Sequence, residues 1–223
     1  MNASEYTEAV EERLRAHSDS IVAGPMAQYM KNHFPFLGIK SPQRKELTKQ
    51  IFRDYGVPED WEQVVRSLWA LPAREYQYVA LDVLEKSKKR LTPNHLPFVV
   101  ELITTKSWWD TVDYLASHTT GKLFAVHPEL IEPNTAAWMD GTNMWLQRTT
   151  ILFQLSYKDK TDQRLLFSLV ERCADSKEFF IQKAIGWALR EYAKTNPKAV
   201  REIVEATPLA SLSRREALKH LSG

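Results

Sequence analysis

The chain has 223 residues, of which 43% are hydrophobic and 26% charged, and its formal net charge is +2. These are the values of an ordinary globular protein, and no run of about 18 apolar residues occurs, which excludes a membrane-spanning helix. Residues 1–5 lack the basic and apolar pattern of a secretory signal, and the single cysteine, Cys173, excludes an internal disulfide. We therefore expect a cytoplasmic protein (in a bacterium, in the cytosol and nucleoid) with no membrane partner.

Helix signals run along the whole chain, and no segment has the alternating pattern of a β-strand. Many of the 11 prolines precede an amphipathic segment, as is usual for a first helical turn. Prolines in this position are Pro25, Pro42, Pro58, Pro93, Pro128 and Pro197. The expected helices cover residues 4–17, 23–33, 42–55, 59–71, 73–89, 93–104, 107–119, 121–126, 128–139, 143–157, 161–174, 177–195, 197–206 and 211–221. The sequence therefore predicts an all-α protein.

A repeat is visible within this helical pattern. The Trp-Leu-Gln-Arg motif of residues 145–148 is echoed by Phe-Ile-Gln-Lys at residues 180–183, which is 35 residues later, and Tyr-Gln-Tyr-Val at 76–79 keeps the glutamine. Helix pairs that recur about every 35–40 residues are typical of an α-solenoid of HEAT-like repeats, whose equivalent positions line one concave surface. Because no linker or low-complexity segment interrupts the pattern, we expect residues 1–223 to form a single repeat domain.

The most unusual stretch is Ser-Trp-Trp-Asp-Thr-Val-Asp at residues 107–113. On a helix, Trp108 and Val112 lie on one face, which we interpret as the buried one. Trp109 and Asp113 lie together on a different face, because they are also four residues apart. An indole beside an unpaired acid is difficult to explain by packing, so we interpret Trp109 and Asp113 as part of a reactive site.

The 35-residue register places this acid among basic residues of the following repeats. Residues 143–223 contain 14 Lys or Arg and 9 Asp or Glu, whereas residues 1–142 contain 16 and 19. Cations and aromatic rings on a groove are suited to phosphates and to sugars or bases. The proposed strip consists of Trp109, Asp113, Arg148, Lys183, Trp187, Arg190 and Lys194.

A carboxylate in a phosphate-binding strip becomes useful if the reaction generates positive charge. Cleavage of an N-glycosidic bond does so, because the sugar passes through an oxocarbenium-like state. Asp113 would stabilise that charge, and the indoles would add cation–π attraction. A base that is already cationic through alkylation needs little acid catalysis to leave, which would explain why no second acid is found opposite Asp113.

In four stretches, residues 25–34, 105–113, 145–155 and 176–197, the sequence resembles the AlkD-like DNA alkylation-repair proteins. These are alkylpurine DNA glycosylases built from HEAT-like repeats, and the similarity runs from about residue 20 to the C-terminus. The resemblance implies excision of 3-methyladenine and 7-methylguanine, with bulky cationic adducts as further substrates, from duplex DNA in base excision repair. It also implies that no cofactor or metal is used and that no pocket receives a flipped base.

The resemblance also implies a role for individual residues. Asp113 corresponds to the catalytic carboxylate, and Trp109 and Trp187 correspond to the indoles that pack against the lesion's deoxyribose and backbone. Arg148 corresponds to an arginine that holds phosphate, and Tyr29 to a tyrosine that lines the same cleft. Ser156 stands where we would expect a lysine in close relatives, which predicts one fewer phosphate contact.

Simpler interpretations remain open at this point. Trp109 could be a second core tryptophan, Arg148 a surface residue whose stem covers apolar side chains, and Lys183, Arg190 and Lys194 a solvated helix face. The histidines show no metal-ligand spacing, so we expect no metal site. The main hypothesis is a monomeric glycosylase acting on double-stranded DNA with alkylated purines. The alternatives are a non-catalytic HEAT-repeat scaffold for DNA or protein, and a binder of branched DNA or RNA.

Overall fold

The computed structural model describes residues 1–221, and within this range all regular structure is helical. The prediction of an all-α protein is confirmed. None of the helices in the described range is long and apolar enough to cross a membrane. The chain divides into two compact units, residues 1–91 and residues from 92 on. Because repeats in an array contact mainly their neighbours, such a division is compatible with one array, and the single domain stays a prediction.

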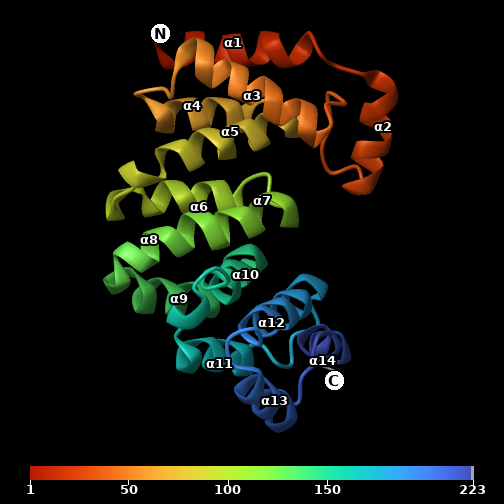
Figure 1. Cartoon of the computed structure of the whole chain (residues 1–223), viewed down its shortest axis with the longest axis vertical. Coiled ribbons are helices and arrows are strands. Elements are labelled where there is room, and N and C mark those ends of the chain that lie inside the picture. Colours follow the sequence, from red (N-terminus) through yellow and green to blue (C-terminus); the bar gives the residue numbers. More distant parts are fainter. Residues whose placement is uncertain (222–223) are drawn as a thin grey trace. The chain divides into compact units, whose positions relative to one another are not determined.

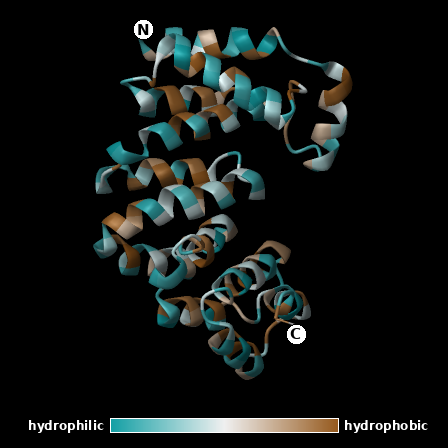
Figure 2. Ribbon diagram, in the orientation of Figure 1, coloured by the Kyte–Doolittle hydropathy of each residue, from teal (hydrophilic) through white to brown (hydrophobic). Residues whose placement is uncertain are grey.

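The first unit is a set of helices with buried aliphatic seams. In Figure 1, α1, α3, α4 and α5 lie side by side, and α2 stands at the edge of this stack. Figure 2 shows apolar residues along α4 and α5, inside this stack. Leu14, Ile51 and Leu68 are completely inaccessible to solvent. The helices are α1 (Ala3–Arg15), α2 (Ser20–Tyr29), α3 (Ser41–Tyr55), α4 (Trp61–Ala70) and α5 (Arg74–Ser87), followed by the short 3₁₀ turn η1 (Lys88–Arg90).

Helix α2 is held by polar contacts rather than by burial, since none of its residues is buried. Asp19 caps its first turn, and the Asp19 N–H donates to the carbonyl of Leu37 at 2.8 Å. The fully buried carboxylate of Glu75 accepts hydrogen bonds from the N–H groups of Leu37, Gly38 and Ile39 at 3.0, 3.0 and 3.1 Å. Glu75 therefore holds residues 37–39 in place, and the hydrogen bond between Asp19 and Leu37 joins this segment to the start of α2.

The second unit contains the Trp-Trp-Asp stretch and the basic residues of the proposed strip. Val112, Leu115, Phe124 and Leu152 are completely buried in its core. Its helices are α6 (Leu96–Thr104), α7 (Trp109–Tyr114), α8 (Gly121–Val126), α9 (Ile131–Asp140), α10 (Met144–Leu152), α11 (Gln163–Arg172), α12 (Phe179–Tyr192), α13 (Pro197–Ala206) and α14 (Ser211–Leu218). The shorter elements are η2 (Pro93–His95), the π-helical segment η3 (Leu115–Thr120), η4 (Pro128–Leu130) and η5 (Lys158–Lys160).

The repeated glutamines have a common structural role. The side-chain amide of Gln77 donates to the carbonyl of Leu71 at 2.8 Å, which lies six residues earlier in the preceding turn. Gln147 and Gln182 donate in the same way to the carbonyls of Gly141 and Ser176, at 2.8 and 2.9 Å. Each glutamine therefore donates to a carbonyl in the turn that follows the preceding helix, where backbone carbonyls lack a partner within a helix. The 35-residue register found in the sequence corresponds to equivalent positions in successive helix pairs.

Most predicted helices are found within a few residues of their expected bounds, but two details differ. Pro25 does not begin a helix, because Asp19 supplies a cap and α2 starts at Ser20, which leaves the proline inside the helix. The segment expected as one regular helix over 107–119 is divided between α7 and the π-helical η3. Single-turn π segments of this kind are frequent near functional sites.

Candidate functional site

Helix α7 begins immediately after Trp108, whose backbone is extended at φ −157° and ψ 161°. The Trp108 ring contacts Trp145 of α10, with ring centroids 5.8 Å apart, and Phe180 of α12, at 5.0 Å. Trp145 and Phe180 also contact each other, at 5.0 Å. These three rings, the aromatic cluster, join the starts of three helices. Trp108 thus packs against two other rings, but it is half-buried rather than buried as expected, and it precedes the helix rather than forming part of it.

Asp113 is bound by Arg148 through two parallel hydrogen bonds. Nε of Arg148 donates to Oδ1 of Asp113 at 2.7 Å, and a terminal nitrogen donates to Oδ2 at 2.8 Å. The exposed fraction of the Asp113 side chain is 14% and that of Arg148 is 5%. The expectation that Asp113 is unpaired is therefore wrong. Residues at equivalent positions of successive repeats lie next to each other, and here they are an acid and a base.

Arg148 is itself fixed by α12. Its other terminal nitrogen donates to the carbonyl of Phe180, and its guanidinium lies 5.8 Å from the centre of the Phe180 ring. The aromatic cluster thus supports the arginine, and the arginine orients the carboxylate. Burial raises the pKa of Asp113 above its ordinary value, while the hydrogen bonds and charge of Arg148 act in the opposite direction.

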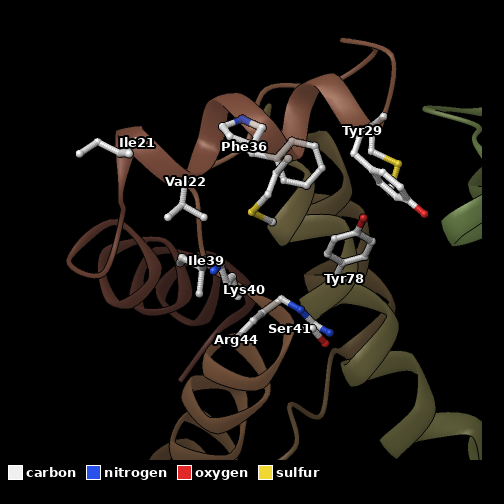
Figure 3. Close-up of a pocket in the computed structure, with 12 residues that line it drawn as sticks. Ile21, Val22, Tyr29, Phe36, Ile39, Lys40, Ser41, Arg44 and Tyr78 are labelled. Atoms are coloured by element: carbon white, nitrogen blue, oxygen red, sulfur yellow. The ribbon is translucent and has the colours of Figure 1, made fainter.

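The two indoles of the proposed strip, those of Trp109 and Trp187, are half-buried. Trp109 is the first residue of α7, one turn before Asp113, and Trp187 lies in the middle of α12. Both belong to the same unit as Asp113. Tyr29 belongs to the other unit, where it is 70% exposed and lines an apolar cavity of about 560 Å³ beside α2 (Figure 3).

The cations of the proposed strip on α12 and in the turn after it have acidic partners. Nζ of Lys183 lies 3.0 Å from one carboxylate oxygen of Glu216, and Arg190 lies 2.6 Å from the other. Lys194 pairs with Glu191 at 2.6 Å. Sequence reasoning missed Glu216, because α14 lies outside the repeated motif and no spacing pattern relates it to α12.

Two sequence-based expectations concern residues away from Asp113. Ser156 is exposed and lines a separate cavity of about 890 Å³ between α9 and α11, so its effect on phosphate binding stays a prediction. Among residues 1–221, no group of three or more His, Cys, Asp and Glu side chains is arranged to hold a metal ion.

The fold and the site define an all-α protein of paired helices with a largely buried carboxylate, which is oriented by an arginine. A family model described as DNA alkylation repair enzyme matches residues 10–221, and the chain therefore belongs to this family of enzymes. A solved structure described as a predicted DNA alkylation repair enzyme from Enterococcus faecalis is 35% identical in sequence, with a TM-score of 0.82. The match covers 92% of this chain and 97% of that one. No curated protein matches the chain.

Proposed function

We propose that the protein is a monofunctional DNA glycosylase that hydrolyses the N-glycosidic bond of cationic alkylated purines in duplex DNA. The substrates would include 3-methyladenine and 7-methylguanine, and bulky cationic adducts would be further candidates. The observation that carries this proposal is the Asp113–Arg148 pair, in which a buried arginine orients a carboxylate that is still partly accessible. The reaction would need neither a metal nor an organic cofactor.

The ion pair with Arg148 changes the environment of Asp113, but the carboxylate can still stabilise a positive charge. An unpaired carboxylate with this degree of burial would be costly to keep ionised, and Arg148 offsets that cost. The pair is neutral overall, yet the negative end is 14% exposed and the positive end only 5%. A developing positive charge that approaches from solvent therefore meets the carboxylate before it meets the guanidinium. An oriented anion of this kind stabilises an oxocarbenium-like sugar without reorganising during the reaction.

In this proposal the roles of the other residues are as follows. Trp109 and Trp187 would contact the deoxyribose and the backbone around the lesion, where indole faces attract a cationic sugar or base. Lys183, Arg190 and Lys194 would contact phosphates. Arg148 would act mainly by orienting Asp113, because its guanidinium already binds Asp113 and Phe180. Tyr29 is proposed as a further DNA contact on the resemblance alone.

The proposal is tested by incubating the purified protein with methylated duplex DNA and measuring the free bases by chromatography. The wild type is expected to release 3-methyladenine or 7-methylguanine, and Asp113→Asn, which keeps the shape of the side chain, to release almost none while still binding duplex DNA. Glu205→Gln on α13 serves as a control, since it removes one negative charge from an exposed position of the same unit and keeps the shape of that side chain. Normal release by Asp113→Asn would contradict the role assigned to the carboxylate.

A non-catalytic scaffold is the second candidate, and one observation favours it. Lys183 and Arg190 of α12 pair with Glu216, and Lys194 in the turn after α12 pairs with Glu191, as they would on a structural helix face. Such a scaffold would release no base from methylated DNA under any condition, so the same assay separates the two functions. The proposal includes a monomer in the cytoplasm, and sedimentation of the pure protein tests the monomer.

A further inference from the structure

Lys183, Arg190 and Glu216 form a compact ion-pair group, the Glu216 triad, between α12 and α14. The two carboxylate oxygens of Glu216 each bind one cation, Oε1 to Lys183 at 3.0 Å and Oε2 to Arg190 at 2.6 Å. The exposed fractions are 37% for Lys183, 23% for Arg190 and 14% for Glu216. The acid is therefore less exposed than either of the two cations.

The backbone around the triad is shaped to bring Glu216 to this position. Gly186 lies on α12 between the two cations, and a Cβ atom built at Gly186 would stand 2.4 Å from the Cβ of Glu216. The hydroxyl of Ser213 also donates to the carbonyl of Gln182 at 3.0 Å. Any residue larger than glycine at 186 would push α14 away, so the close approach of these helices places one carboxylate within reach of two turns of α12.

The triad matters because Lys183 and Arg190 are two of the cations that the proposed function assigns to DNA phosphates. Contacts to phosphate give affinity for any duplex and carry no information about the base. A lysine and an arginine alone would present a charge of +2, and Glu216 reduces it to +1. The hydrogen bond from Lys183 lowers the pKa of Glu216, so the carboxylate is ionised at neutral pH and this reduction is permanent there.

We propose that Glu216 limits the sequence-independent affinity of the α12 cations for duplex DNA by neutralising one of their two positive charges. This inference rests on the proposed function, because it requires that Lys183 and Arg190 face DNA. A repair enzyme must leave undamaged sites, which outnumber lesions greatly, and weaker sequence-independent binding shortens each unproductive encounter.

The test compares wild type with Glu216→Gln in binding to a fluorescent, undamaged duplex over a range of salt concentrations. Glutamine keeps the carbon atoms that pack against Gly186 but removes the charge. One additional phosphate contact steepens the slope of log K against log salt by about 0.9, so binding is expected to be about tenfold tighter near ~50 mM salt and almost unchanged near ~1 M. The affinity for damaged duplex is expected to rise by the same factor, so the ratio of the two affinities stays unchanged, because a new phosphate contact favours both duplexes equally.

Two further variants keep the result interpretable. Glu205→Gln removes the same charge from an exposed position on α13, and it is expected to leave the slope unchanged. Lys183→Gln combined with Glu216→Gln returns the triad to a charge of +1 and is expected to return the affinity close to that of the wild type. Thermal unfolding of each variant shows whether the fold is kept.

Unchanged or weaker binding by folded Glu216→Gln would overturn the inference, and so would an equal gain in Glu205→Gln, which would indicate an effect of net charge alone. If Glu216→Gln does not fold, the double variant decides, since affinity far from that of the wild type would also overturn it. If the wild type releases methylated bases but Glu216→Gln binds duplex DNA no more tightly, only this inference is refuted. A wild type that neither binds duplex DNA nor releases bases refutes the proposed function as well.

Discussion

Replacing Arg148 by glutamine leaves Asp113 without its partner in a position where only 14% of its side chain is exposed. Breaking one side of a buried ion pair destabilises a protein by about 3–5 kcal/mol. Asp113 has an alternative, however, since it can take up a proton. The free energy needed to protonate it at pH 7 is about 4 kcal/mol, because its unfolded pKa is about 3.9 and each pH unit corresponds to about 1.4 kcal/mol. The expected loss at pH 7 is therefore about 3–4 kcal/mol.

The same reasoning predicts how this loss depends on pH. In Arg148→Gln the folded-state pKa of Asp113 rises further above its unfolded value, because Arg148 normally lowers it. A carboxyl with a raised folded-state pKa binds its proton more tightly in the folded protein, so the variant is stabilised as the pH falls towards the unfolded pKa. At pH 5 the protonation cost is only about 1.5 kcal/mol, so the difference from wild type is expected to shrink by about 2 kcal/mol.

Urea denaturation of wild type and Arg148→Gln at pH 7 and pH 5 measures both quantities. The control is Arg148→Gln combined with Asp113→Asn, which removes the buried charge and is expected to show a difference from wild type that varies little with pH. An equal loss of stability in Arg148→Gln at both pH values would refute the idea that an unpaired, buried charge on Asp113 is its cause. The loss would then come from the contacts of Arg148 with Phe180.

Three further predictions concern catalysis and the frame of the site. The rate of base release is expected to fall at low pH with a midpoint above the ordinary aspartate pKa of about 4, because burial raises the pKa of Asp113. Arg148→Gln is expected to move that midpoint upward, because Arg148 lowers the pKa of Asp113. A pH profile of single-turnover release checks both results. Trp109→Ala and Trp187→Ala are each expected to slow release by about 2–30-fold, from the loss of a cation–π contact of roughly 0.5–2 kcal/mol, whereas an unchanged rate would make them packing residues. Gly38→Ala is expected to destabilise the protein by more than about 1 kcal/mol, because φ is +90° at this residue and a Cβ would stand 2.0 Å from the carbonyl oxygen of Asp19. An unchanged melting temperature of this variant would contradict the prediction.

The helices and the repeat register could be predicted from the sequence because both depend on local patterns. Prolines, capping residues and apolar periodicity act over a few residues, and the recurring glutamines satisfy carbonyls six residues earlier. The predicted start of one helix was wrong, because the sequence offers two possible starts there. Asp19 is a capping residue four positions before residue 23, where the helix was expected to start, and α2 follows that cap.

The candidate site was only partly predictable, for a different reason. The register already placed Asp113 and Arg148 at equivalent positions, and equivalent positions of adjacent repeats lie side by side, so their pairing could have been inferred. Glu216 could not have been, because it approaches Lys183 and Arg190 from α14 through a close contact at Gly186. A contact of this kind depends on how two helices pack, and no sequence spacing describes it.

Single-turnover release of 7-methylguanine by wild type and by Asp113→Asn, with duplex affinity measured for both, tests the central claim most directly. The account predicts a loss of about 100-fold or more in rate with affinity nearly unchanged, since only an interaction specific to the transition state is removed. Equal rates in the two proteins, or no release by the wild type, would contradict it.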